Sequence, residues 1–182
     1  TWTNLSTSGN FGNANLVSSS TTGAFSGMNA YTSSGSPKYF TQLRAYLPVH
    51  NGGTARNLYY PLTYSVWVYP TVLSSYQTII DQGNDDFFFG FDNANLILYD
   101  PQHQGITSGI STNTWYNFAV THTLGQNFKF YQDGVLKNTI TDTQTSWTGT
   151  FTDFSFGSGG ESSLSNVVNN NEGFSGRVGA IM

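Results

Sequence analysis

The hydrophobic pattern of this chain has a period of two, and it is clearest between residues 115 and 139. Aromatic and β-branched residues alternate with polar or small ones over 116–121 and again over 128–133, which is the pattern of strands with one buried face. Asp133 and Gly134 then separate the second run from a third that begins at Val135. An Asp-Gly pair between two such runs predicts a hairpin turn, because Gly adopts positive φ freely and Asp tolerates it. We therefore interpret Asp133 as a turn residue and not as a catalytic or metal-binding carboxylate.

Short strands separated by turn residues are predicted along the rest of the chain, and no long segment shows helical periodicity. Residues 38–47 are compatible with a strand or a short helix. Residues 1–60 as a whole predict strands and loops that form the opening edge of the same domain as residues 61–182. This organisation indicates an all-β fold, an antiparallel β-sandwich of the jelly-roll type. The remaining predicted strands are 64–68, 77–81, 87–91, 96–99, 135–139, 151–157 and 173–182.

Composition narrows the classes of function. The 182 residues carry a formal net charge of −4, and the six Lys and Arg residues are scattered singly, so no basic surface for nucleic acid is predicted. No apolar run approaches the ~18 residues of a membrane-spanning helix. The absence of Cys excludes disulfide bonds and thiolate metal sites. Only 9% of the residues are charged, while Ser, Thr and Asn are abundant, and this favours an extracellular or virion-surface protein.

The order of several motifs resembles that of a known superfamily. The motifs are "YSVWVYP" at 64–70, "TIIDQG" at 78–83, "FFFGFDNANLILY" at 87–99, "WYNFAVTH" at 115–122, "FKFYQDGVL" at 128–136, "FSFGS" at 154–158 and "FSGRVGAIM" at 174–182. In this order they resemble the laminin-G-like members of the concanavalin A-like lectin and glucanase superfamily. The resemblance begins near residue 61 and implies a concanavalin A-like jelly roll over 61–182. Because the family pattern continues past its last motif, we expect the C-terminal strand to be incomplete here.

A superfamily that includes glucanases, lectins, pentraxins and adhesion modules does not by itself define a function. Glycoside hydrolysis needs two carboxyl groups on either side of the scissile bond, and the concanavalin-like glucanases place acids alternately on one strand. This chain has only two glutamates, Glu161 and Glu172, without that spacing, and the adjacent Asp85 and Asp86 would face opposite sides of a strand. We therefore expect no catalytic residues. The alternative is a secreted polysaccharide hydrolase of the glucanase type.

Calcium is the only cofactor that the sequence suggests. Hard cations bind carboxylate and carbonyl oxygens, and the segment 81–86 carries Asp81, Asn84, Asp85 and Asp86. The resemblance adds that some members of the superfamily hold calcium at the rim of the sandwich. These four residues are the candidate metal ligands, with solvated turn residues as the competing interpretation.

The histidines do not predict a metal site, and His122 and two tryptophans are expected to have structural roles. His50, His103 and His122 lack the spacing of a metal site, and His122, at the end of a strand, is expected to be a half-buried polar residue. Trp67 and Trp115 lie within strand patterns, as Phe118 does, and all three are expected in the core.

Aromatic residues at strand ends are the candidates for glycan binding, because exposed rings stack on sugars. They are Tyr69, Tyr76, Tyr99 and His103. The leading hypothesis is a non-catalytic recognition or structural module that binds a glycan or a neighbouring subunit through rim loops, such as a capsid decoration, fibre or adhesion protein. A purely structural protein that assembles with itself, with no ligand, is the third hypothesis.

Overall fold

Every regular element in the described part of the chain is a β-strand. The computed structural model describes residues 20–26, 28–34, 41–43, 56–57, 62–74, 76–82, 87–100, 102–106, 108–123, 126–141, 148–149, 154–156 and 173–181. These residues include no helix of the length and hydropathy that crossing a membrane requires. The predicted all-β, antiparallel fold is confirmed.

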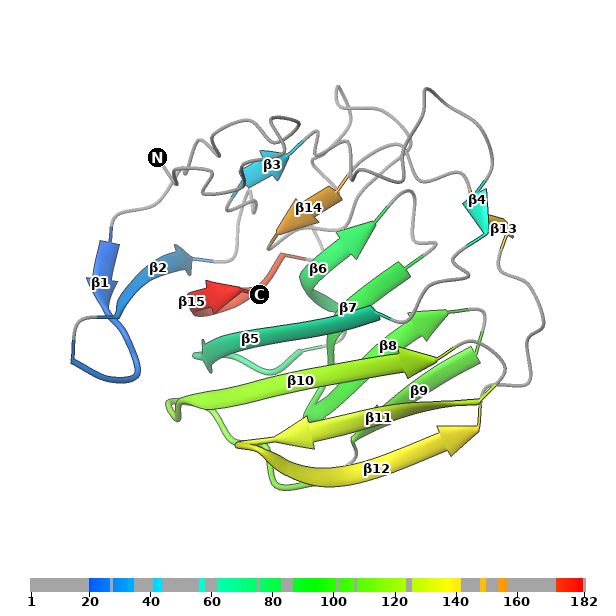
Figure 1. The fold of residues 1–182 in the computed structure, drawn as a ribbon. Helices are drawn as coiled ribbons and strands as arrows, with labels where there is room; N and C mark the ends of the chain where they lie inside the picture. Colours follow the sequence, from blue (N-terminus) through cyan, green and yellow to red (C-terminus); the bar gives the residue numbers. More distant parts are fainter. Residues whose placement is uncertain are drawn as a thin grey trace.

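The larger of the two main sheets has seven strands in the order β1-β2-β15-β5-β10-β11-β12, and each neighbouring pair is antiparallel (Figure 1). Strands from the two ends of the chain lie side by side in it, because β2 pairs with β15. The strands are β1 (Ser20–Thr22), β2 (Asn29–Ser34), β5 (Leu62–Pro70), β10 (Tyr116–Thr123), β11 (Asn127–Gln132), β12 (Val135–Thr141) and β15 (Ser175–Ile181).

The smaller main sheet has six antiparallel strands in the order β3-β14-β6-β7-β8-β9. Its last strand, β9, was missing from the sequence prediction. The segment 38–47 contributes only β3 as described structure. The strands are β3 (Thr41–Leu43), β6 (Gln77–Gln82), β7 (Phe87–Asp92), β8 (Asn95–Asp100), β9 (Gln102–Ile106) and β14 (Phe154–Phe156), while β4 (Arg56–Asn57) and β13 (Thr148–Gly149) form a separate pair.

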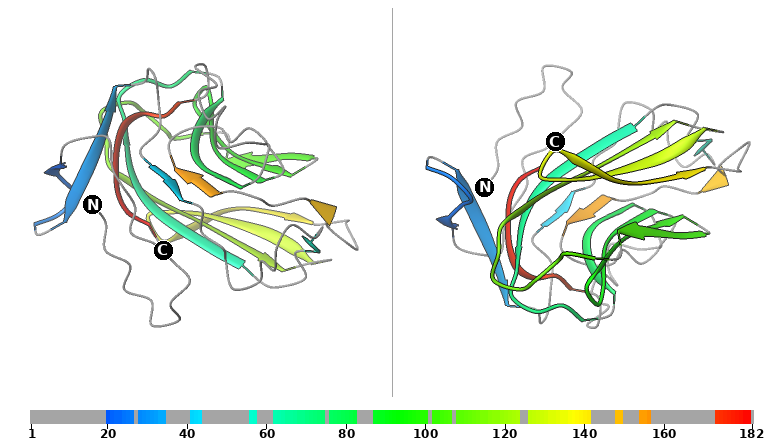
Figure 2. Two further views of the ribbon diagram at one scale, coloured as in Figure 1. Left: turned by 90° about the horizontal axis from the view of Figure 1, so that it is seen from above. Right: turned by 90° about the horizontal axis from the view of Figure 1, so that it is seen from below.

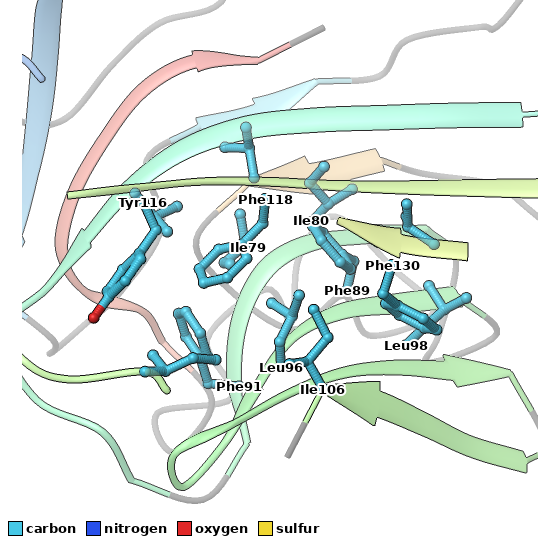
Figure 3. Close-up of a cluster of buried hydrophobic side chains, with 14 of the residues drawn as sticks. Ile79, Ile80, Phe89, Phe91, Leu96, Leu98, Ile106, Tyr116, Phe118 and Phe130 are labelled. Atoms are coloured by element: carbon cyan, nitrogen blue, oxygen red, sulfur yellow. The ribbon is translucent and has the colours of Figure 1, made fainter. Parts of the chain in front are cut away.

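The two sheets face each other across one hydrophobic core. The strands of the larger sheet curve around the smaller sheet, as both views in Figure 2 show. Phe118 and Phe130 reach in from the larger sheet, and Phe89 and Leu98 reach in from the smaller one (Figure 3). Phe91 of β7 lies edge-on to Phe118 with ring centroids 5.9 Å apart. This layered arrangement is the jelly-roll sandwich that the alternating pattern predicts.

Alternation explains which residues of β10 and β11 are inside. Phe118 and Val120 are fully buried, and the intervening residues of β10 are partly exposed on the outer face. His122 follows the same parity and is only 2% exposed, with its ring stacked on Phe128 at a centroid distance of 4.1 Å. The expectation that His122 is half-buried was therefore wrong, because its strand position places it in the core.

The turn after β11 has the predicted conformation. Asp133 and Gly134 have φ values of 52° and 77°, and they connect Gln132 to Val135, which lie opposite each other in register. The Asp133 side chain has a further role, since its Oδ1 accepts a hydrogen bond from the Asn117 backbone N–H at 2.8 Å. The Asp133 N–H in turn donates to the Asn117 carbonyl at 2.7 Å. The hairpin turn is thus attached to the start of β10.

The Asn138 side chain connects the two sheets along one edge. The Asn138 Nδ2 group on β12 donates to the Gly105 carbonyl on β9 at 2.8 Å. Both strands are the last ones of their sheets. The contact therefore joins the two sheets at the edge where β9 and β12 leave backbone groups without a neighbouring strand.

We predict that Gly134→Val destabilises the fold by about 1–2 kcal/mol, because a β-branched residue cannot adopt the positive φ of this turn without strain. Urea unfolding followed by circular dichroism measures the change. Leu136→Val, an exposed strand position next to the turn, should change stability by less than about 0.5 kcal/mol. Equal losses in the two variants would contradict the turn assignment.

Tyr64 gives the core a pH-dependent contribution. It packs against the buried cluster from β5. Burial raises the pKa of its hydroxyl from 10.0 to about 12, because the phenolate would lose its hydration. Between these values the unfolded chain has released the proton and the folded chain has kept it. The Tyr64 contribution to stability is therefore complete below pH 10 and is lost as the pH rises to about 12.

We predict that Tyr64→Phe removes part of the alkaline loss of stability. Between pH 10 and 12, the free energy of unfolding of the wild type should fall more steeply than that of the variant, by up to about 1.4 kcal/mol per pH unit. A pH series of urea unfolding curves tests this. Tyr131→Phe, on the outer face of β11, is the control, and identical slopes for wild type and Tyr64→Phe would refute the prediction.

Candidate functional site

Strand directions divide the four predicted ligand-binding residues between opposite ends of the sandwich. Tyr69 precedes the end of β5 and Tyr76 precedes the start of β6, so both lie at the end that we call the Pro70 end (Figure 1). Tyr99 and His103 flank the turn between β8 and β9 at the other end, where they oppose each other in register. The structure therefore does not bring the four residues together, and the side chains of Tyr99 and His103 lie outside its description.

Of the predicted calcium ligands, only Asp81 has a described position, near the end of β6 that is far from Pro70. Asn84, Asp85 and Asp86 are outside the described residues, and of Asp81 only the strand position is described. Register places Asp81 opposite Phe88, and Phe88 in turn opposite Tyr99. Among the side chains that the structure describes, no group of three or more His, Cys, Asp or Glu residues could hold a metal. The calcium site stays a prediction.

Trp67 and Tyr69 lie on the outer face of the larger sheet. Their neighbours Val66 and Val68 are fully buried in the core, so the alternate residues of β5 point outwards, and both rings are partly exposed. Trp115, which precedes β10, is also partly exposed. The expectation that Trp67 and Trp115 are core residues was therefore wrong, because the residues buried in the core are the valines on either side of Trp67 and the Tyr116 that follows Trp115. Phe118 is fully buried, as expected.

The outward rings form two contacting pairs, and Arg177 lies next to one of them. Phe25, which is 54% exposed, lies edge-on to Trp67 with centroids 5.7 Å apart. Tyr69 packs against Trp115 at 5.5 Å, and the Arg177 guanidinium lies 4.9 Å from the Tyr69 centroid. Because Trp67 and Tyr69 are alternate residues of one strand, the two pairs share a face. We call these five residues the outer aromatic cluster.

The loop between β1 and β2 brings Phe25 to this cluster. Its conformation is fixed by hydrogen bonds from the Gly23 N–H to the Met28 carbonyl at 2.9 Å and from the Met28 N–H to the Phe25 carbonyl at 3.1 Å. Met28 is only 8% exposed, and it packs where Gly179 has no side chain. A Cβ atom on Gly179 would lie 2.6 Å from the Met28 Cε and 3.2 Å from the Trp67 Cβ. The loop is therefore seated on the sheet next to Trp67.

Hydrogen bonds connect three loops and the start of β15 at the Pro70 end. The Thr71 N–H donates to the Ser175 carbonyl at 3.0 Å, and the Asn113 N–H donates to the Pro70 carbonyl at 2.7 Å. The Asn93 N–H donates to the Ser74 carbonyl at 2.9 Å. The first two bonds hold Thr71 and Asn113 beside Pro70, which follows Tyr69 of the outer aromatic cluster in the chain.

Tyr76 is exposed on one of these loops. It is 43% exposed and has a φ of 50°, a backbone conformation that only a few per cent of non-glycine residues adopt. Ser74 and Gln77, on either side of it, are connected by a weak 3.4 Å hydrogen bond from the Ser74 N–H to the Gln77 side chain. Of the predicted ligand-binding residues, Tyr69 and Tyr76 are thus the two whose side chains are described at this end.

The two carboxylates described as side chains both belong to turns. The Asp92 Oδ1 accepts from the Asn93 Nδ2 at 3.0 Å, and the Asp133 Oδ1 accepts from the Asn117 N–H. The Asn117 side chain, opposite Trp67 in register, donates to the Ser65 hydroxyl at 3.3 Å. Planar rings with amide and hydroxyl groups beside them are suited to binding a polar ligand that has an apolar face.

The sequence matches the model of a family described as the concanavalin A-like lectin/glucanases superfamily over residues 42–179. No curated protein sequence matches it significantly. Domain 4 of AbnA, a GH43 extracellular arabinanase from Geobacillus stearothermophilus, has a similar structure, in complex with arabinotriose. The identity is 17% and the TM-score 0.60, over 96% of this chain and 83% of that chain.

Two botulinum neurotoxin structures are also similar. One is of type C, whose cell entry depends on interaction with two ganglioside molecules, with 18% identity and a TM-score of 0.55 over 82% of this chain and 39% of the toxin chain. The other is the binding domain of neurotoxin DC in complex with rat synaptotagmin II, with 18% identity and a TM-score of 0.56 over 82% and 40%. Both likenesses show a shared fold, and this chain spans about two fifths of each toxin chain.

We predict that Gly179→Ala destabilises the protein by about 1 kcal/mol, at the low end of overpacking costs, because the flexible end of Met28 can move away from the added methyl group while the Trp67 Cβ can give only slightly. Met28→Ala should relieve part of this loss, so the double variant should be more stable than the sum of the single losses implies. Urea unfolding of the wild type and the three variants gives the coupling energy. Strictly additive losses would show that Met28 does not pack on Gly179.

Proposed function

Because the chain belongs to the concanavalin A-like lectin/glucanases superfamily, we propose that it is a non-catalytic carbohydrate-binding module whose ligand stacks on the outer aromatic cluster. The observation that carries the proposal is the pairing of partly exposed aromatic rings on one sheet face. Single exposed apolar residues are common on protein surfaces, whereas apolar side chains that lie together in a patch on the surface mark interaction sites. Here Phe25, Trp67, Tyr69 and Trp115 remain accessible on the outside.

A sugar ring fits such a surface for physical reasons. Its C–H faces are apolar and stack on aromatic rings, while its hydroxyl groups need hydrogen-bonding partners at the rim. Trp67 and Tyr69 would supply the rings, with their outward direction fixed by β5. Tyr76 and the amides and hydroxyls of the loops at the Pro70 end would supply the partners. Rings and loops held in place lose little conformational entropy when a ligand binds.

The comparisons support a glycan as the ligand. The similar arabinanase domain is in complex with arabinotriose, and the similar type C neurotoxin interacts with gangliosides. The neurotoxin domain in complex with synaptotagmin II supports a neighbouring protein as a second class of partner. At these identities the likeness extends to the fold alone, so the aromatic cluster carries the assignment to this chain.

Two observations favour binding over hydrolysis. A glycosidase needs two carboxyl groups about 5–10 Å apart beside the sugar. Asp92 and Asp133, the carboxylates among the described side chains, both accept hydrogen bonds from asparagine groups at turns. The sequence also lacks glutamates at glucanase spacing. A secreted polysaccharide hydrolase is therefore the alternative that the experiment below must exclude.

The proposed setting is the outside of a cell or of a virion, where the low charge and the abundance of Ser, Thr and Asn are common. There the module would display the outer aromatic cluster to glycans, in an adhesion protein, capsid decoration or fibre. Calcium bound by Asp81, Asn84, Asp85 and Asp86 is part of the proposal. A rise in melting temperature with added calcium that EDTA reverses would support it, because a ligand of the folded state stabilises that state.

We predict that the double variant Trp67→Ala/Tyr69→Ala weakens glycan binding about tenfold or more, because stacking area is lost. A polysaccharide panel that includes arabinan, measured by affinity electrophoresis and calorimetry, provides the test. Leu136→Ala, an exposed apolar residue of edge strand β12, is the matched control and should bind as the wild type does.

Two results would overturn the proposed function. The first is the absence of binding to every glycan of the panel by the wild-type protein. The second is release of reducing sugar that ends when a single carboxylate is changed to its amide, which would establish the hydrolase. Unchanged binding by a folded Trp67→Ala/Tyr69→Ala protein would instead show that the glycan binds elsewhere.

A further inference from the structure

We propose that Arg177 makes the outer aromatic cluster selective for glycans that carry a carboxylate, such as uronic or sialic acids. The inference rests on the proposed function and specifies the class of ligand for the same face. Three observations on Arg177 support it: the guanidinium packs on Tyr69, no described carboxylate pairs with it, and it lies beside the aromatic rings that would stack on the sugar.

The guanidinium group of Arg177 is positioned before any ligand binds. Arg177 lies opposite Tyr69 on β5 and opposite Thr32 on β2, so its strand has a hydrogen-bonded neighbour on both sides. The guanidinium carbon lies 4.9 Å from the centroid of the Tyr69 ring, and the ring's other contact is Trp115 at 5.5 Å. A guanidinium that packs on an aromatic ring retains N–H donors along its edge for a further partner.

The charge of Arg177 has no carboxylate partner within the described part of the chain. The described carboxylates, those of Asp92 and Asp133, are hydrogen-bonded at turns to Asn93 and Asn117. A partly buried guanidinium without a counter-ion gains most from a ligand that accepts two parallel hydrogen bonds, which a carboxylate does. The neutral hydroxyls of a sugar form weaker bonds with the same donors.

The position of Arg177 indicates that the carboxylate it binds would belong to a sugar. The guanidinium lies on the Tyr69 ring, which itself packs on Trp115, so an anion at Arg177 would have its own ring, or the next ring of its chain, beside the aromatic cluster. The protein carries a net charge of −4, which disfavours long-range attraction of anions. At physiological ionic strength such repulsion is screened beyond ~8 Å, so direct contact with Arg177 decides the preference.

Matched pairs of probes separate the charge from the rest of the ligand. Trigalacturonate is compared with its methyl ester, and 3′-sialyllactose with lactose, by calorimetry at 0.15 M salt. We expect at least one acidic probe to bind about tenfold or more tightly than its neutral partner, as a bidentate hydrogen bond to a charged group predicts. A preference in the first pair identifies uronic acids, and one in the second identifies sialic acids.

Arg177→Gln should abolish the preference, with a much smaller loss of affinity for the neutral probe, because neutral hydroxyls bond more weakly to the guanidinium. Arg177→Lys keeps the positive charge but cannot form the bidentate hydrogen bonds to a carboxylate, so it should retain only part of the preference. Lys129→Gln makes the same change in net charge on β11, where it lies opposite Thr121, and should keep the full preference. Melting temperatures establish that each variant is folded.

Equal affinity of the wild type for both members of each pair, or no binding of any of the four probes, would overturn the inference. A preference that survives in folded Arg177→Gln would also overturn it. The proposed function fails separately, if the polysaccharide panel shows no glycan binding or if reducing sugar is released in a way that depends on a single carboxylate. Neutral binding that depends on Trp67 and Tyr69, with no acidic preference, would retain the proposed function and reject the role of Arg177.

Discussion

The burial of aromatic rings between the two sheets is the interaction on which the rest of the structure depends. Phe91 of the smaller sheet lies edge-on to Phe118 of the larger sheet and stacks on Phe174, which precedes β15, at 6.1 Å. All three rings are fully buried, and each contributes about 1.5–3 kcal/mol by leaving water. The contact joins strands far apart in sequence and holds the entry to β15 against the core. Since β15 lies between β2 and β5, the order of the larger sheet depends on it.

Packing of the core also determines what the outside presents. A strand cannot turn Val66 and Val68 inwards without turning Trp67 and Tyr69 outwards. The outer aromatic cluster is therefore a direct result of the register that fills the core. Two glycines of β15 allow the strand and the β1–β2 loop to approach this cluster closely. A side chain on Gly176 would collide with the Tyr69 carbonyl oxygen, and one on Gly179 would displace Met28 from its place beside Trp67. These positions keep β15 and the β1–β2 loop tightly against the face that carries the rings.

Much of the fold could be predicted from the sequence, because alternation and turn chemistry are local. Strand β10 and the Asp133-Gly134 turn follow from neighbouring residues alone. Strand β9 was missed because "QHQGI" offers one apolar residue and a glycine, and pairing with β8 decides its conformation. The face of Trp67 was assigned wrongly because "YSVWV" has Tyr64 and two valines at alternate positions, with Ser65 and the large Trp67 between them. Either set could face the core, and only the partner sheet decides which one does.

The candidate site was less predictable than the fold, since it depends on register across strands that are distant in sequence. Tyr69 was recognised as a strand-end aromatic residue, but its partners could not be predicted. Trp115 precedes β10 and Arg177 lies in β15, 46 and 108 residues further along the chain. Nothing local to Arg177 predicts that it packs on Tyr69. The antiparallel pairing of β15 with β5 places these two residues opposite each other. A recognition surface on a β-sandwich is thus assembled by the sheet, and each strand contributes residues whose role is visible only in the presence of the others.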